Sequence, residues 1–318
     1  MKQIKIVLAI VACFIYTSSF AQKTEFIIDA DTGNEMDDLY AIVRAFDDNE
    51  VILQGLISAH FNNPQLVTDS MWNSYSTENI NTLQLSQMEN ERLLRECNMQ
   101  RIPHPPGCEK MVGYSWGYYE GAQIPQSEGV DFIIEMAKKY SPEKKLNVVC
   151  LGAVTNVAAA ILTAPSIAKN IRLYALTMKY DLEKKVWNKN SFNARNDLNA
   201  LDIVLNQTEL ELFIIPGQVS QKLTFDRADT QKRLARYKNE VSKNLSDRWD
   251  KVNAGNSWIM WDLALIEAIL HPEFATLEKG LTPPENIQRE INIYSKIDAN
   301  AMRKDFWKAY KKLMKRMN

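Results

Sequence analysis

Short apolar runs alternate along the chain with longer segments whose apolar residues recur at helical spacing. The apolar runs have the length of buried strands, and we predict strands at residues 26–28, 51–58, 146–151, 171–177 and 211–216. The segments between them predict helices at residues 37–46, 129–140, 155–162, 197–206 and 258–270. This alternation indicates an α/β fold with a Rossmann-like, mostly parallel sheet flanked by helices.

The stretch 63–126 departs from this alternation because it is rich in Asn, Gln, Pro and aromatic residues. We expect it to form an elaboration over the strand ends. Neither an internal repeat nor a low-complexity linker divides the chain, so residues 22–318 are expected to form a single domain. The basic, amphipathic segment 304–318 predicts a terminal helix that packs with one face, which we favour over a role at a membrane surface.

Residues 1–21 have the pattern of a secretory signal peptide, with a Lys-bearing start, an apolar run and small residues before a cleavage point after Ala21. Export to the periplasm or the outside of the cell is therefore predicted. A lipoprotein box ending at Cys13 is the alternative, but the apolar run continues past that cysteine. No later stretch approaches the roughly 20 apolar residues that a membrane span needs.

Charge and cysteine content limit the classes of partner and cofactor. The net charge of −1 gives no indication of a general nucleic-acid or anionic-membrane binder. Cys97 and Cys108 flank one loop and could form a disulfide in an exported protein, whereas Cys150 lies in an apolar run and is expected to be buried. The chain has three histidines and no Cys/His spacing typical of zinc.

An acidic loop between the first strand and the first helix is the strongest chemical signal. It holds five carboxylates within residues 29–38, namely Asp29, Asp31, Glu35, Asp37 and Asp38. Like charges at this density repel one another unless a cation lies among them. Oxygen ligands suit Ca²⁺ first and Mg²⁺ next, and strand ends are where open α/β sheets bind ligands. A solvated helix cap is the alternative, but five acids around Gly33 favour a metal site.

Other polar groups follow later strands or begin helices, where they could complete a site. They are the segment 58–63, the strand-to-helix turn 151–156, the segment 191–197 and the sequence Met260-Trp261-Asp262. Asp262 lies among apolar residues, and a charge in such surroundings is rarely buried without a partner. It is interpreted either as an acid at a helix start or as a metal ligand contributed from distant sequence.

Four motifs, DADTGNEMDD, LGAVTNVAAAI, SFNARNDLNAL and WDLALIEAILHPEF, resemble the inosine-uridine-preferring nucleoside hydrolase family in order and spacing. The resemblance covers residues 23–274, with two extra residues between Gly33 and the paired acids. It implies a nucleoside hydrolase-like fold and calcium-dependent hydrolysis of the N-glycosidic bond of a small-molecule nucleoside. A homo-oligomer, either a dimer or a tetramer, is compatible with it.

The resemblance also implies roles for individual residues. The Ca²⁺ ligands would be the carboxylates of Asp31, Asp38 and Asp262 and the carbonyl of Leu151. Asp31 would in addition accept the proton of the attacking water. Asp37 and Asp262 would hold the 2′- and 3′-hydroxyls of the ribose, and Asn193 and Asn62 would contact the sugar. Asp29 and Glu35 would support these groups.

Departures from the family pattern concern the base and the ribose 5′ side. Trp261 stands where pyrimidine-accepting members have a histidine, and an indole that stacks on the base favours purine nucleosides. Trp116 could form a second stacking wall or merely anchor a loop.

Ser191 replaces a family glutamate and Met178-Lys179 a glycine pair at the 5′ side. Two alternatives follow: a ribose-binding or nucleoside-binding protein without catalysis, and a hydrolase of a 5′-modified riboside.

Overall fold

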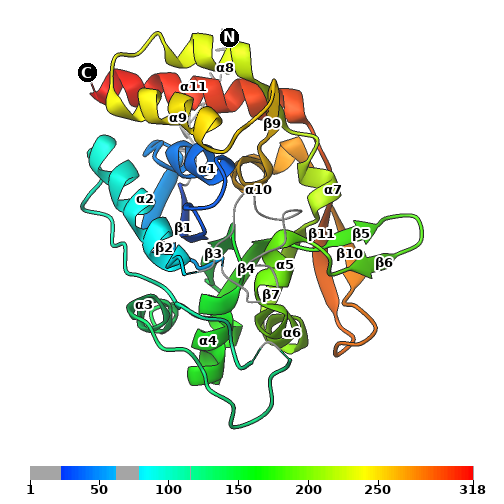
Figure 1. The fold of residues 1–318 in the computed structure, drawn as a ribbon. Helices are drawn as coiled ribbons and strands as arrows, with labels where there is room; N and C mark the ends of the chain where they lie inside the picture. The colour runs from blue at the N-terminus through cyan, green and yellow to red at the C-terminus, as the bar shows by residue number, and fades with distance from the viewer. Residues whose placement is uncertain (1–22, 62–78, 115, 318) are drawn as a thin grey trace, which may run out of the picture.

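The computed structural model describes residues 23–61, 79–114 and 116–317. Its centre is a seven-stranded sheet in the order β10-β11-β7-β4-β3-β1-β2 (Figure 1). Neighbouring strands run parallel except for β10, which is antiparallel to β11. The prediction of a mostly parallel α/β sheet is therefore confirmed. The strand bounds are β1 Thr24–Ala30, β2 Val51–Ser58, β3 Leu146–Cys150, β4 Ile171–Leu176, β7 Glu211–Ile215, β10 Ala275–Leu281 and β11 Glu290–Ile297.

Both faces of the sheet are covered by helices because its strands are apolar on both sides. In β1, Phe26 and Ile28 pack into one core and Ile27 into the other. The first core lies under α1 (Asp37–Ala45), α9 (Glu240–Lys251), α10 (Trp261–Leu270) and α11 (Ala299–Met317). The second lies under α3 (Glu128–Ala137), α4 (Thr155–Thr163) and α6 (Leu198–Asn206).

Shorter elements follow the strand ends and shape the surface there. After β4 come the hairpin β5 (Lys179–Asp181) and β6 (Val186–Asn188) and the short helix α5 (Phe192–Asn196). Helix α7 (Gly217–Ser220) follows β7, and the pair β8 (Thr224–Asp226) and β9 (Ser257–Ile259) precedes α10. The remaining elements are α2 (Thr82–Glu96), α8 (Arg227–Leu234) and the 3₁₀ helices Pro165–Asn170 and Pro272–Phe274.

Two of the predicted elements need correction. The helix expected from residue 258 begins at Trp261, because residues 257–259 pair with β8 as a strand. The stretch 63–126, expected to be irregular, contains the 15-residue helix α2. Its cap is Asn81, whose side-chain oxygen accepts a hydrogen bond from the backbone N–H of Gln84 at 2.9 Å. The mixed polarity of α2 hid its helical period.

The C-terminal segment forms the expected packing helix, since α11 buries Phe306, Tyr310 and Leu313 on one face. Cys97 and Cys108 are free and buried in different cores, so the disulfide considered between them does not form. Within the described residues, we find no helix long and apolar enough to cross a membrane. The predicted signal peptide, residues 1–21, lies outside the described residues.

Candidate active site

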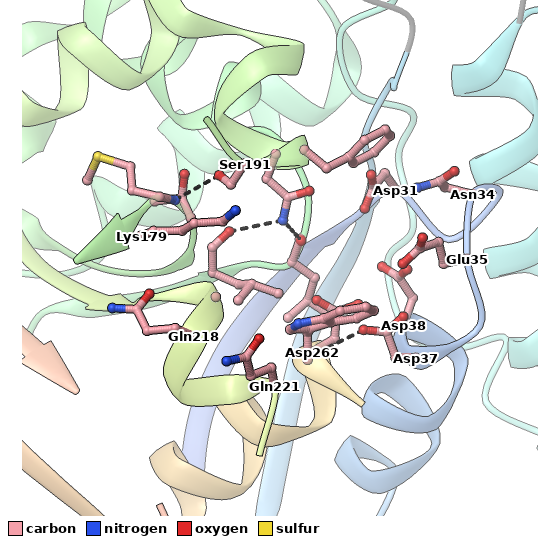
Figure 2. Close-up of a pocket in the computed structure, with 18 residues that line it drawn as sticks. Asp31, Asn34, Glu35, Asp37, Asp38, Lys179, Ser191, Gln218, Gln221 and Asp262 are labelled. Atoms are coloured by element: carbon pink, nitrogen blue, oxygen red, sulfur yellow. Dashed lines mark hydrogen bonds between the residues drawn. The ribbon is translucent and has the colours of Figure 1, made fainter. Parts of the chain in front are cut away.

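A pocket of about 540 Å³ opens at the carboxyl ends of the central strands. It is bounded by the acidic loop after β1, by Leu151 after β3 and by residues 176–179 after β4. The starts of α5 and α10, together with α7, complete its wall (Figure 2). The motifs singled out in the sequence therefore converge on one cavity, at the edge where α/β sheets bind ligands.

Three carboxylates form the tightest group in this pocket. Asp37 and Asp38 begin α1, and Asp262 lies in the first turn of α10. Each offers an oxygen within 4.8 Å of the others, and all three residues are buried. The backbone N–H of Asp262 donates to Oδ2 of Asp37 at 3.1 Å. We call these three residues the pocket carboxylates.

One oxygen of each pocket carboxylate lacks a donor. Oδ1 of Asp37, Asp38 and Asp262 is buried and has no hydrogen-bond partner among the described residues. An unsatisfied buried acceptor costs about 1–3 kcal/mol, and more when it is charged. Three such oxygens, on carboxylates that lie this close together, therefore fit a hard divalent cation, which would satisfy them together.

The raised pKa values of the pocket acids also indicate that too little positive charge lies near them. Burial, followed by the charge of Asp37, raises the pKa of Asp38 to about 7. Burial, followed by the charges of Asp37 and Asp38, raises the pKa of Asp262 well above its ordinary value. Burial also raises the pKa of Glu35, on the rim, to about 8. The pocket therefore takes up either protons or a cation.

Arg248 of α9 binds the backbone of the acidic loop. Its guanidinium donates to the carbonyls of Thr32 at 3.1 Å, Asn34 at 3.2 Å and Glu35 at 3.0 Å. Gly33 lies so close to α2 that a Cβ there would be 2.8 Å from Cβ of Leu85. The glycine therefore serves close packing, and Arg248 fixes the backbone that carries the two extra residues.

Asp31 lies on the same pocket but outside the tightest group. It is buried, and a Cβ on Gly152 would come within 2.9 Å of its Cγ, so the glycine makes room for this side chain. Burial and the charge of Asp38 raise the pKa of Asp31 well above its ordinary value. The carboxylates of the expected ligand set were those of Asp31, Asp38 and Asp262, with the carbonyl of Leu151 as the fourth ligand. The structure groups Asp37 with Asp38 and Asp262 and places Asp31 on the same pocket.

The floor of the pocket is fixed by Asn193 of α5. Its Nδ2 donates to the carbonyl oxygens of Leu151, after β3, and Leu176, in β4. The N–H of Leu151 in turn donates to the carbonyl of Asp29 at 2.8 Å. The carbonyl expected to bind a metal is thus oriented by the hydrogen bond from Asn193, and the backbone of its residue is anchored to β1.

Sequence comparison identifies the family. The profile of the inosine-uridine preferring nucleoside hydrolases matches residues 26–307, most of the chain. The chain belongs to this family. A search of curated protein sequences finds no match. Members of the family depend on a metal, and the pocket carboxylates are a group that could hold one.

Solved structures of nucleoside hydrolases and of one effector protein share the fold. A plant nucleoside hydrolase, PpNRh1, superposes with a TM-score of 0.66 at 14% identity, over 91% of this chain and 99% of its own. A purine-preferring ribonucleoside hydrolase from Gardnerella vaginalis gives 0.64 at 17%, over 92% and 99%. The type III effector XopQ, solved with adenosine diphosphate ribose, gives 0.66 at 12%, over 92% and 95%.

The other residues expected in this nucleoside hydrolase site are placed as follows. Trp261 and Ser191 line the pocket, as do Met178 and Lys179. Trp116 does not: its side chain is 73% exposed and stacks on Tyr114 and Tyr119 instead. Its interpretation as a stacking wall is therefore wrong. Asn62 lies outside the described residues.

Three residues of the site were not foreseen from the sequence. Gln218 of α7 and Gln221, directly after that helix, line the pocket, and Arg248 holds the acidic loop. Gln218 donates from its side chain to the carbonyl of Tyr180 and so joins α7 to the hairpin β5–β6. None of the three belongs to a motif, so only the folded chain brings them to the pocket.

Proposed function

We propose that this nucleoside hydrolase uses a calcium ion to cleave purine ribonucleosides to free base and ribose, and that it acts after export from the cytoplasm. Family and fold support hydrolysis of an N-glycosidic bond. The observation that supports a calcium site is the set of three buried Oδ1 atoms of Asp37, Asp38 and Asp262, which have no hydrogen-bond donor among the described residues. The N-terminal sequence supports export.

When bound, calcium would supply positive charge that binds the ribose diol and lowers the pKa of a water molecule. It acidifies water less than zinc does, so a carboxylate must act as the base. Asp31 is the candidate, because it lines the same pocket as the pocket carboxylates, where Gly152 leaves room for its side chain. Asp37 and Asp262 would bind the sugar hydroxyls, and Asn193 holds the floor on which the sugar rests.

These residues, a water molecule and solvent account for every bond and proton in the proposed reaction. The water oxygen forms a bond to C1′, the C1′–N bond breaks, and its electron pair moves to the base. The water proton passes to Asp31, and the leaving base takes a proton from solvent. The sugar passes through an oxocarbenium-like state, which the surrounding carboxylates stabilise electrostatically.

The preference for purines rests on Trp261. This residue lines the pocket one position before Asp262, so an indole lies next to the proposed sugar site. A stacked base gains about 1–3 kcal/mol from such a ring, and a purine offers the larger face. Trp261→Ala should therefore lower kcat/KM for inosine about 10- to 100-fold and that for uridine by less.

The direct test is hydrolysis of inosine, adenosine, guanosine and uridine by the purified protein, with reducing sugar as the readout. We expect ribose release from the purine nucleosides in calcium, and its loss in EDTA. Absence of release from all four in saturating calcium would contradict the proposal. Calorimetry in the same buffer would then show whether the chain binds nucleosides without cleaving them.

A second candidate substrate is a riboside modified at its 5′ position. Ser191 and Met178-Lys179 depart from the family pattern at that side, and the structurally similar XopQ was solved with adenosine diphosphate ribose. The two substrate classes share the diol and the glycosidic bond, so the same carboxylates would serve both.

A further inference from the structure

Charge is segregated within the pocket. Glu35, Asp37 and Asp38 lie on one side, and Lys179 and Ser191 lie on the opposite side (Figure 2). The amine of Lys179 points toward the interior of the pocket in this view. A ligand with a cation-binding end and an anionic end would match this division of charge.

The backbone is arranged to hold Lys179 there. Met178 has φ of 56°, a left-handed conformation that is unfavourable for a residue with a side chain. Its N–H donates to Oγ of Ser191 at 2.9 Å, and its carbonyl accepts from the N–H of Gly217 at 3.0 Å. The side chain of Met178 is buried, and the turn leaves Lys179 on the pocket wall.

No acidic side chain among the described residues neutralises the charge of Lys179. Lys179 makes no ion pair with any of the described residues. Lys189, at the end of the same hairpin, pairs with Asp202 at 2.7 Å and Glu285 at 2.8 Å. The charge of Lys189 is therefore neutralised locally, whereas that of Lys179 is available to a ligand.

Ser191 can add a donor to the same wall. Its Oγ accepts from Met178, and no described residue accepts its hydroxyl proton. A phosphate oxygen would therefore find an ammonium group and a hydroxyl donor together, two groups that bind phosphate readily. A glutamate in place of Ser191 would repel the same anion.

We propose that this wall, Lys179 with Ser191, binds an anionic group, and that the preferred substrate is a ribonucleoside 5′-phosphate. The inference rests on the proposed function for the position of the sugar. With the 2′- and 3′-hydroxyls at the carboxylates and the base attached to C1′, O5′ is the remaining substituent that can carry the anion. The pocket, at about 540 Å³, is within the usual size for a small-molecule site.

The test compares ribose 5-phosphate with ribose by calorimetry in calcium, so that no turnover is needed. We expect ribose 5-phosphate to bind about 10- to 100-fold more tightly, the scale of a charge-assisted hydrogen bond. Lys179→Gln and Ser191→Glu should reduce this ratio to near one. Lys184→Gln should retain it, because Lys184 is exposed on the same hairpin, pairs with Asp181 and does not line the pocket.

A ratio near one in the unaltered protein, or a ratio that survives Lys179→Gln, would overturn the inference. Orotidine, whose base carries a carboxylate, tests the other source of an anion. If Lys179→Gln weakens binding of orotidine and leaves that of ribose 5-phosphate unchanged, Lys179 and Ser191 bind an anionic group on the base. The assignment of this wall to a 5′-phosphate would then be wrong. Hydrolysis of inosine but not inosine 5′-phosphate would also contradict the inference, while hydrolysis of neither would count against the proposed function itself.

Discussion

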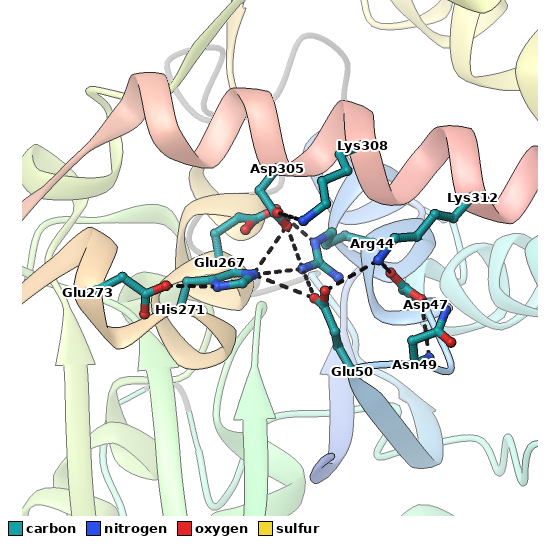
Figure 3. A network of polar contacts seen from close by, with 10 residues as sticks. All are labelled: Arg44, Asp47, Asn49, Glu50, Glu267, His271, Glu273, Asp305, Lys308 and Lys312. Atoms are coloured by element: carbon teal, nitrogen blue, oxygen red, sulfur yellow. Dashed lines mark hydrogen bonds and ion pairs between the residues drawn. The ribbon is translucent and has the colours of Figure 1, made fainter. Parts of the chain in front are cut away.

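Two clusters of ionisable groups lie at opposite ends of the same two helices. At the starts of α1 and α10 are the pocket carboxylates Asp37, Asp38 and Asp262. At their other ends are Arg44 of α1, Glu267 of α10 and His271, which directly follows α10, joined by Glu50 and Asp305 (Figure 3). We call these latter five residues the Arg44 cluster.

By geometry alone, both clusters could hold a metal. Glu50, His271 and Asp305 also bring ligand atoms within 4.8 Å of one another. However, the Arg44 guanidinium already donates to Glu267 at 3.0 Å, Asp305 at 2.7 Å and Glu50 at 2.5 Å. A metal would have to displace this cation. The pocket carboxylates have no such partner at their Oδ1 atoms among the described residues.

The pKa values of Glu50 and Asp305 are shifted opposite to those of the pocket carboxylates, whereas burial raises the pKa of Glu267, in the same cluster, to about 8. The hydrogen bond to His271 and the charge of Arg44 hold the pKa of Glu50 far below its ordinary value, although burial opposes them. In the pocket, burial and neighbouring like charges raise the pKa of Asp38 and Asp262. A group of acids therefore indicates a metal site when the fold supplies no cation, and a structural clamp when it does.

The sharpest test of this comparison replaces one acid in each cluster. Asp262→Asn should abolish calcium binding and lower turnover about ten-thousand-fold, the scale seen when a catalytic unit loses one essential member. Asp305→Asn should leave calcium affinity and turnover nearly unchanged and lower the melting temperature. Calcium titration by calorimetry and ribose release measure the two. Loss of calcium binding in Asp305→Asn would show that the Arg44 cluster holds the metal.

Removing the cation of the Arg44 cluster should lower the stability of the fold more than the rate of hydrolysis. Arg44→Met leaves three acids buried or half-buried without their partner, and breaking such a pair costs about 3–5 kcal/mol. Urea unfolding followed by tryptophan fluorescence would measure the change. Lys138→Met is the control, because Lys138 and its partner Glu135 are exposed and the unfolding midpoint should hardly move. Equal midpoints for the two variants would refute the clamp.

Much of the fold and part of the site could be predicted because their signals are local. The strand 26–28, the acids that follow it and the turn after residue 151 are contiguous in sequence. Asp262 could be found as well, since a carboxylate among apolar residues needs a partner. The sequence thus predicted which segments meet at the strand ends.

What could not be predicted depends on packing between distant segments. Arg248 binds carbonyls more than 200 positions earlier in the chain, and no local pattern marks it. Likewise, the five members of the Arg44 cluster are spread over three helices and a turn. Charge pairing at long range is a property of the fold.

The smallest predicted effect concerns the pH dependence of the Arg44 cluster. Hydrogen bonds to Asp305 and Glu50 raise the pKa of His271 from 6.5 to about 10. Its stabilising contribution is therefore complete below about pH 6.5 and is lost as the pH rises through about 10. His271 is partly exposed, so solvent screening limits the contribution to about 1 kcal/mol. Between pH 6.5 and 10 the melting temperature should fall about 2–4 °C more in the unaltered protein than in His271→Asn, as measured by thermal denaturation. Parallel curves for the two proteins would mean that His271 is neutral in the folded state and that Arg44 alone neutralises these acids.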